Sequence, residues 1–189
     1  MHNNTSYPDA NNILEVLYNR KPSYLPMYEH HISDAFIEKA TGTSFADAIE
    51  TDPKAYFTEI IKFWNENTYD AFDFEAPICE VFPDHGAIMG GRLGPIQTRE
   101  DFERYPFDEI PNLFWKANKP KLDAIRAVLP KDMKAYGGCG YGIFESAQDL
   151  VGYESLCVLQ YIDPDLFRDL FIKIGDLYEN LWERMVREY

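Results

Sequence analysis

The sequence predicts an α/β fold built from parallel βα units, and three observations support that class. Short apolar runs alternate along the chain with longer helical patterns, which is typical of strand–helix–strand units. The strongest helical pattern starts at residue 163 and repeats apolar residues every three or four positions, namely Leu166, Leu170, Ile174, Leu177, Leu181 and Met185. Only three runs qualify as strands, too little sheet for helices with such broad apolar faces, so we expect more sheet beyond these 189 residues.

Helices and strands of the N-terminal half are predicted from apolar spacing and from the residues that begin or end helices. A helix is expected over 9–19, and a second over 33–42, where Gly42 would end it. Asp52 as N-cap and Pro53 at the first helical position predict a third helix over 52–67. Short strands are expected near 24–28 and over 71–75, the second of which ends before Pro77.

The C-terminal half continues the alternation. A glycine-rich loop over 83–95 precedes a helix that Thr98 and Asp101 begin as a capping box. A helix over 111–130, interrupted near Pro120, leads to a short buried strand over 133–138. Four glycines within 137–142 then form a loop, and two helical segments over 142–162 are separated near Gly152.

Composition excludes several classes of protein. The chain carries 18 Lys and Arg against 32 Asp and Glu, a formal charge of −14, which disfavours binding to nucleic acid or to an anionic membrane surface. No apolar run approaches the roughly 20 residues of a membrane span, and the first twelve residues lack the pattern of a signal peptide. Three cysteines without a C-x-x-C spacing predict reduced thiols. We therefore expect a cytoplasmic protein without nucleic-acid or membrane partners.

Three stretches, in their order and spacing, resemble a known family. They are "TYDAFDFEAPICEVFPDHGA" at 68–87, "GPIQTREDFERYPFDEIP" at 94–111 and "KAYGGCGYGIFESAQDLVGYESLCVLQYIDPDLFRDLF" at 134–171. Together they resemble the uroporphyrinogen decarboxylase (URO-D) superfamily, which includes the decarboxylase of tetrapyrrole synthesis and the methyltransferases that act on corrinoid proteins or coenzyme M. The resemblance covers the first half of a family member, and it predicts a single URO-D-like domain over 1–189.

The resemblance implies a (β/α)8 TIM barrel, of which this chain would be a partial barrel. In such barrels the carboxyl ends of the strands build the active site. The glycines at 137–142 would then form a βα loop, whose backbone amides approach a carboxylate or another anion at a helix N-terminus. The alternative is a tight turn that binds no ligand.

The residues decide between the branches of the superfamily. The decarboxylase's arginine motif is replaced by "YLPMYEHH", its catalytic aspartate falls near Ala76 with Glu75 as the nearest acid, and its active-site tyrosine falls near Ser146. A tetracarboxylate substrate needs cationic partners, which this chain lacks at these positions. The resemblance therefore implies a corrinoid-linked methyltransferase, in which zinc activates a thiolate. The family's zinc ligands, His-x-Cys and a distant Cys, lie in the half that this chain does not match, so no cofactor is expected in this half.

Candidate site residues follow the expected strands. We predict Glu75 and His30 as catalytic residues, and as substrate-binding residues Glu29, His31, Gly138, Cys139, Gly140, Tyr141 and Glu145. Burial beside apolar residues would raise the pKa of Glu75 and suit acid–base chemistry, although a hydrogen bond to the loop is the alternative. Adjacent histidines in an extended segment cannot both face one site.

Other interpretations of these residues stay open. Cys139 is either a reactive thiolate near a helix N-terminus or a small packing residue. Glu145 and Asp149 lie on one helix face and are expected to be solvated acids. A metal site from His30 or His31 with Glu75, His85 and Cys79 matches no ligand spacing, so no metal ligands are predicted.

Two other functions compete with methyl transfer from a corrinoid protein to a small-molecule substrate. One is a carboxy-lyase that acts on a tetrapyrrole, as uroporphyrinogen decarboxylase does. The other is an inactive, truncated half barrel, whose exposed strand edges and apolar helix faces would promote a homodimer.

Overall fold

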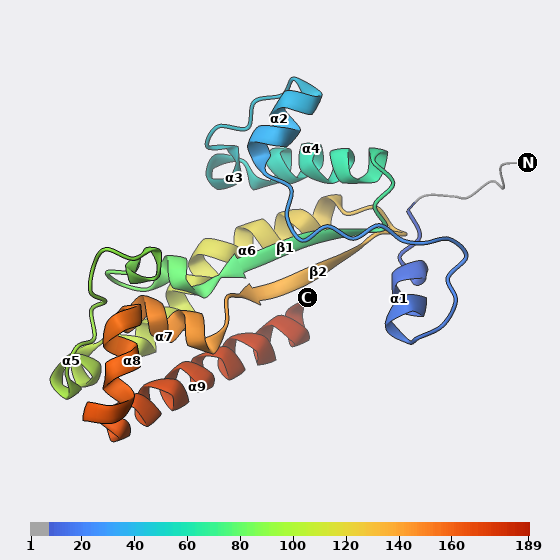
Figure 1. The fold of residues 1–189 in the computed structure, drawn as a ribbon. Coiled ribbons are helices and arrows are strands. Elements are labelled where there is room, and N and C mark those ends of the chain that lie inside the picture. Colours follow the sequence, from blue (N-terminus) through green and yellow to red (C-terminus); the bar gives the residue numbers. More distant parts are fainter. Residues whose placement is uncertain (1–7) are drawn as a thin grey trace, which may run out of the picture. The chain divides into compact units, whose positions relative to one another are not determined.

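The computed structural model describes residues 8–189, and it confirms a mixed α/β fold with parallel strands (Figure 1). The chain divides into two compact units. The first unit comprises the residues up to Phe74 together with Pro120–Gly137, and the second comprises Glu75–Lys119 together with Gly138–Tyr189. The prediction that the N-terminus is no signal peptide rests partly on residues 1–7, which lie outside the described residues.

In the described part of the chain, the sheet has two parallel strands, β1 (Ala71–Pro77) and β2 (Lys134–Gly140) (Figure 1). Both are longer than predicted, and β2 includes three glycines that were expected in a loop. Only the carboxyl end of β2 is buried, so the prediction of a buried strand is wrong for its first half. The strand expected near 24–28 is also wrong: a single parallel bridge joins Met27 to Tyr69, because Pro26 lacks the amide that a ladder needs.

The first unit surrounds an aromatic core. Its helices are α1 (Asn11–Leu17), α2 (Asp34–Thr41), α3 (Ala48–Thr51) and α4 (Pro53–Glu66). Phe57 and Trp64 of α4 meet the ring of Phe72 edge to face, at centroid distances of 6.1 and 5.5 Å. The predicted helix ends are confirmed, since the Asp52 carboxylate accepts a hydrogen bond from the amide of Ala55 and Gly42 has φ +74°.

Helix α1 contradicts its predicted amphipathic pattern. Leu14, Leu17 and Tyr18 are 42, 71 and 66% exposed, whereas Asn12 is buried. The reason is local, because Asn12 Oδ1 accepts hydrogen bonds from the amide and the hydroxyl of Ser23, at 2.8 and 2.7 Å. These hydrogen bonds to the segment that follows α1 therefore orient this short helix.

The second unit is mostly helical. It contains 3₁₀ helices at Ile78–Val81, Ala87–Met89 and Phe107–Glu109, α5 (Arg99–Arg104), α7 (Ile143–Val151), α8 (Tyr153–Ile162) and α9 (Pro164–Glu188). The predicted capping box of α5 and the break at Gly152 are confirmed. Helix α6 (Ile110–Val128) passes through Pro120 without a break, contrary to prediction, and its residues belong to both units.

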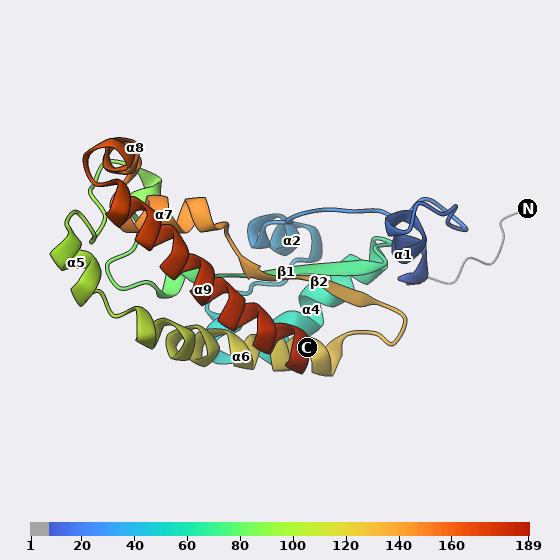
Figure 2. The same ribbon diagram turned by 90° about the horizontal axis from the view of Figure 1, so that it is seen from below.

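Helix α9 confirms the strongest sequence prediction. Figure 2 shows it as one continuous helix, which follows α8 and ends at Glu188. The carboxylate of Asp163 caps it by accepting a hydrogen bond from the amide of Leu166 at 2.9 Å. All six residues of the predicted stripe are buried, and α9 packs on α7 and α8.

No helix in residues 8–189 combines the length and the apolar character that crossing a membrane requires.

Two isoleucines of α9 test the buried stripe. Ile174 is fully buried and Ile172, half a turn away, is 55% exposed. We expect Ile174→Ala to lower the free energy of unfolding by about 2–5 kcal/mol, because it leaves a cavity in the packed face. Ile172→Ala, the matched control, should change it by less than about 0.5 kcal/mol. Urea unfolding followed by circular dichroism measures both, and equal losses would contradict the burial of this stripe.

Candidate functional site

The carboxyl ends of β1 and β2 contain most of the predicted site residues. In the second unit, Glu75 lies directly beside Gly140, because a Cβ built on this glycine would stand 3.1 Å from Glu75 Cβ and 3.5 Å from Pro77 Cα. A side chain at position 140 would therefore crowd β1 at the site. Glu75 itself is exposed, so the predicted burial of this carboxylate beside apolar residues is wrong.

Helix α9 explains why position 138, in the glycine-rich stretch 137–142, is a glycine. Gly138 has φ +132°, and a Cβ at this position would lie 2.3 Å from Cη2 of Trp182. Only glycine combines that backbone conformation with such a close ring. Packing thus accounts for Gly138 and Gly140 without a ligand, which favours the tight-turn interpretation of this segment.

Tyr178 of α9 holds the turn between β2 and α7. Its hydroxyl lies 2.9 Å from the carbonyl oxygen of Tyr141 and 3.2 Å from that of Gly140, and it donates its proton there. Ser146 Oγ stands 3.1 Å from the same hydroxyl, and burial raises the pKa of Tyr178. These contacts hold Tyr141 at φ +67°, with its side chain 41% exposed.

Glu145 caps the N-terminus of its own helix, α7. Its Oε2 accepts a hydrogen bond from the amide of Gly142 at 2.6 Å, as the N3 residue of a capping box does. A negative charge thus already occupies the position at which an anion would bind to the first amide of α7. The site therefore suits a neutral or cationic ligand better than the anion that the glycine run suggested.

Asp149 is a buried carboxylate that sequence reasoning misplaced. It was expected to be solvated, yet it is fully buried, and its Oδ1 accepts hydrogen bonds from the amides of Gly86 and Ile88 at 2.8 and 3.0 Å. This carboxylate fastens the glycine-rich loop over 83–95 to α7. The apolar residues on both sides, Leu150 and Ala147, were the only sequence signal of its burial.

The two buried cysteines are neutral thiols. Burial raises the pKa of Cys79 and of Cys139 to about 12, and Cys79 Sγ lies 3.6 Å from Ser146 Oγ. The thiolate interpretation of Cys139 is therefore disfavoured and packing explains it. All three cysteines are free, as expected, and Cys157 is exposed.

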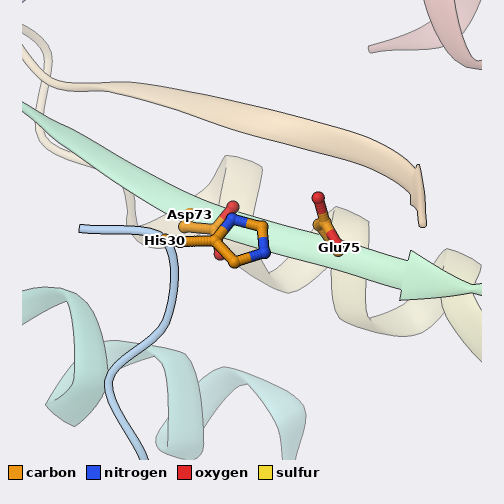
Figure 3. Close-up of side chains that lie close together, drawn as sticks. All are labelled: His30, Asp73 and Glu75. Carbon is orange, nitrogen blue, oxygen red and sulfur yellow. The ribbon is translucent and has the colours of Figure 1, made fainter. Parts of the chain in front are cut away.

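A second cluster lies in the first unit. Glu29, His30 and His31 are exposed, and one of the histidines, His30, lies beside Asp73 of β1, with the nearest ligand atoms of the two side chains within 4.8 Å (Figure 3). Asp73 was not among the predicted residues. Its position two residues before Glu75, on the same face of β1, was the signal that could have identified it.

Aromatic contacts position His30. The ring of Tyr28 stacks on that of Tyr136 at 5.3 Å, and the Tyr136 hydroxyl donates a hydrogen bond to the carbonyl oxygen of Glu29. Burial raises the pKa of this tyrosine, and the negative charge of Asp73 raises it further. The segment around His30 is thus fixed against the sheet, and His31 follows it into solvent.

Comparisons of the chain with protein-family models, with curated proteins and with solved structures find no match. The resemblance to the URO-D superfamily, and the roles that it implies for Glu75, His30 and the substrate-binding residues, therefore stay predictions.

Substitution of two glycines tests whether packing requires the glycine run. Gly138→Ala should lower the free energy of unfolding by at least about 1 kcal/mol more than Gly90→Ala, because both positions have positive φ but only the first meets a ring. Urea unfolding measures both. In a Trp182→Leu background the extra loss at Gly138 should shrink, and an unchanged loss would contradict this explanation.

Thiol reactivity tests the state of the cysteines. With a thiol reagent at about pH 8, we expect Cys157 to react rapidly, because the other two thiols are buried and a pKa of about 12 leaves a thiolate fraction of about 10⁻⁴. Unfolding in urea should expose Cys79 and Cys139, so that two further equivalents of reagent are consumed.

The same thiols make the stability depend on pH. Their contribution to the free energy of unfolding is complete below the unfolded pKa of about 9, and it is lost as the pH rises through the folded pKa of about 12.

The Cys157→Ser variant is the control for this measurement. It should remove the rapid phase and leave the two slow equivalents. A second rapid equivalent in this variant would show that Cys79 or Cys139 is accessible and ionised in the folded protein.

Proposed function

We propose that the chain belongs to a methyl-transferring enzyme of the URO-D type, which acts with a corrinoid protein on a small-molecule substrate, within a partial (β/α) barrel. The observation that carries the proposal is the arrangement in the second unit. There the carboxyl end of β1 contains Glu75 and leads into the 3₁₀ helix Ile78–Val81, and the exposed Tyr141 follows the carboxyl end of β2.

The charges favour methyl transfer over the decarboxylase branch. The predicted site residues of the second unit include Glu75 and Glu145 but no lysine or arginine. Four substrate carboxylates would meet like charges there, whereas a methyl group carries no charge that needs a cationic partner. An exposed aromatic ring at Tyr141 also suits the apolar body of a small donor or acceptor.

Zinc does not fit the two buried cysteines of this chain. Activation of a thiol acceptor in the methyltransferase branch requires a metal held by thiolates, but Cys79 and Cys139 are buried and neutral. Under this proposal the zinc ligands belong to the portion of the family fold that these residues do not match. The strand ends described above would contribute residues to the substrate side of the site, with Glu75 as its carboxylate.

A methyl-transfer assay tests the proposal. The protein encoded by the complete gene is incubated with zinc, methylcobalamin and a small thiol such as coenzyme M, and loss of the methylcobalamin absorbance is followed in the dark. We expect protein-dependent transfer that falls at least tenfold in Glu75→Gln, because the carboxylate lies at the strand end beside Gly140. Glu183→Gln, an exposed glutamate of α9, is the matched control and should transfer at the wild-type rate.

Two outcomes would overturn the proposal. One is the absence of transfer above the rate without protein. The other is the release of carbon dioxide from a tetrapyrrole acid by the same sample, which would favour the carboxy-lyase.

A further inference from the structure

We propose that His30 and Asp73 of the first unit bind a divalent first-row transition-metal ion. This site is separate from the thiolate zinc site of the methyl-transfer proposal and does not depend on it. The two side chains come from segments more than forty residues apart, and their nearest ligand atoms lie within 4.8 Å of each other (Figure 3).

The distance suits a shared ion. Zinc lies about 2.0–2.2 Å from imidazole nitrogen and carboxylate oxygen, so two ligands in tetrahedral geometry stand about 3.4 Å apart. His30 is exposed and can rotate to reach this separation, whereas Asp73 is partly buried in β1. The remaining positions around the ion would face solvent and hold water.

The backbone of the site is fixed before the ion binds. The Met27–Tyr69 bridge ties the segment to the residues that lead into β1, and the Tyr28–Tyr136 stack holds it on the side of β2. After His30 the chain enters α2, where Asp34 accepts a hydrogen bond from the hydroxyl of Tyr56 at 2.8 Å. Ordering these residues therefore costs little when the ion binds.

The surrounding charge favours a cation. The side chain of Glu75 lies on the same face of β1 as that of Asp73, because the two residues are two positions apart in the strand. Glu29 directly precedes His30 in the sequence. A bound divalent ion would offset the repulsion between the carboxylates that β1 carries on this face. One imidazole nitrogen with a carboxylate oxygen favours zinc, cobalt or nickel over calcium and magnesium, which prefer oxygen ligands alone.

Titration with Co²⁺, without an affinity tag on the protein, tests the site. We expect one equivalent to bind with visible d–d absorption and without the near-ultraviolet thiolate band, since the proposed ligands are nitrogen and oxygen. His30→Ala should weaken the affinity at least tenfold, and Asp73→Asn should weaken it as well. His31→Ala is the matched control, because this neighbouring histidine is also exposed, and it should change the affinity less than twofold.

The outcomes separate this site from the methyl-transfer proposal. A thiolate band that His30→Ala leaves unchanged would overturn the inference while supporting a cysteine-held metal. Equal losses in His30→Ala and His31→Ala would also overturn it, as would the absence of binding. Because His30 is exposed, its variant should fold, which circular dichroism checks, and the test holds even if Asp73→Asn does not fold.

Discussion

The second unit depends on the packing of α9 against the turn between β2 and α7. Trp182 occupies the space that a side chain at Gly138 would need, and one helical turn earlier Tyr178 bonds the carbonyl groups of the turn. The same hydroxyl meets Ser146, which in turn meets Cys79 just beyond β1. One face of α9 therefore determines where the carboxyl ends of both strands stand in this unit, and with them Glu75 and Tyr141.

Buried carboxylates supply a second kind of constraint. Asp149 accepts two amide hydrogen bonds from the glycine-rich loop in the second unit. In the first unit Asp70, also fully buried, accepts hydrogen bonds from the amide of Asp9 and the hydroxyl of Tyr24, at 2.7 and 2.5 Å. Asp149 joins segments 61 and 63 residues apart, and Asp70 joins segments 46 and 61 residues apart. Either carboxylate would leave donors without partners if an apolar residue replaced it.

Periodic and capping signals predicted the helices well, because they depend on neighbours within one turn. The stripe of α9, the Asp52 cap and the break at Gly152 are all of this kind. Prediction failed where another segment of the chain buries a polar side chain, as at Asn12 and Asp149. From the sequence alone, a polar residue is expected to be exposed to solvent. Prediction also missed that His30 lies beside Asp73. The bridge between Met27 and Tyr69 and the stacking of Tyr28 on Tyr136 bring these two side chains together.

The division of the chain also sets the order in which the protein can form during synthesis. The aromatic core of the first unit includes Ala124, Ile125 and Met133 beside Phe57 and Trp64, which are translated 60 to 76 residues earlier. The ribosome must therefore deliver all of α5 and α6 before that core can close, and the apolar face of α4 stays partly uncovered meanwhile. Such long-range contacts slow folding and expose apolar surface to other chains, so a chaperone that binds the nascent chain would act in this interval.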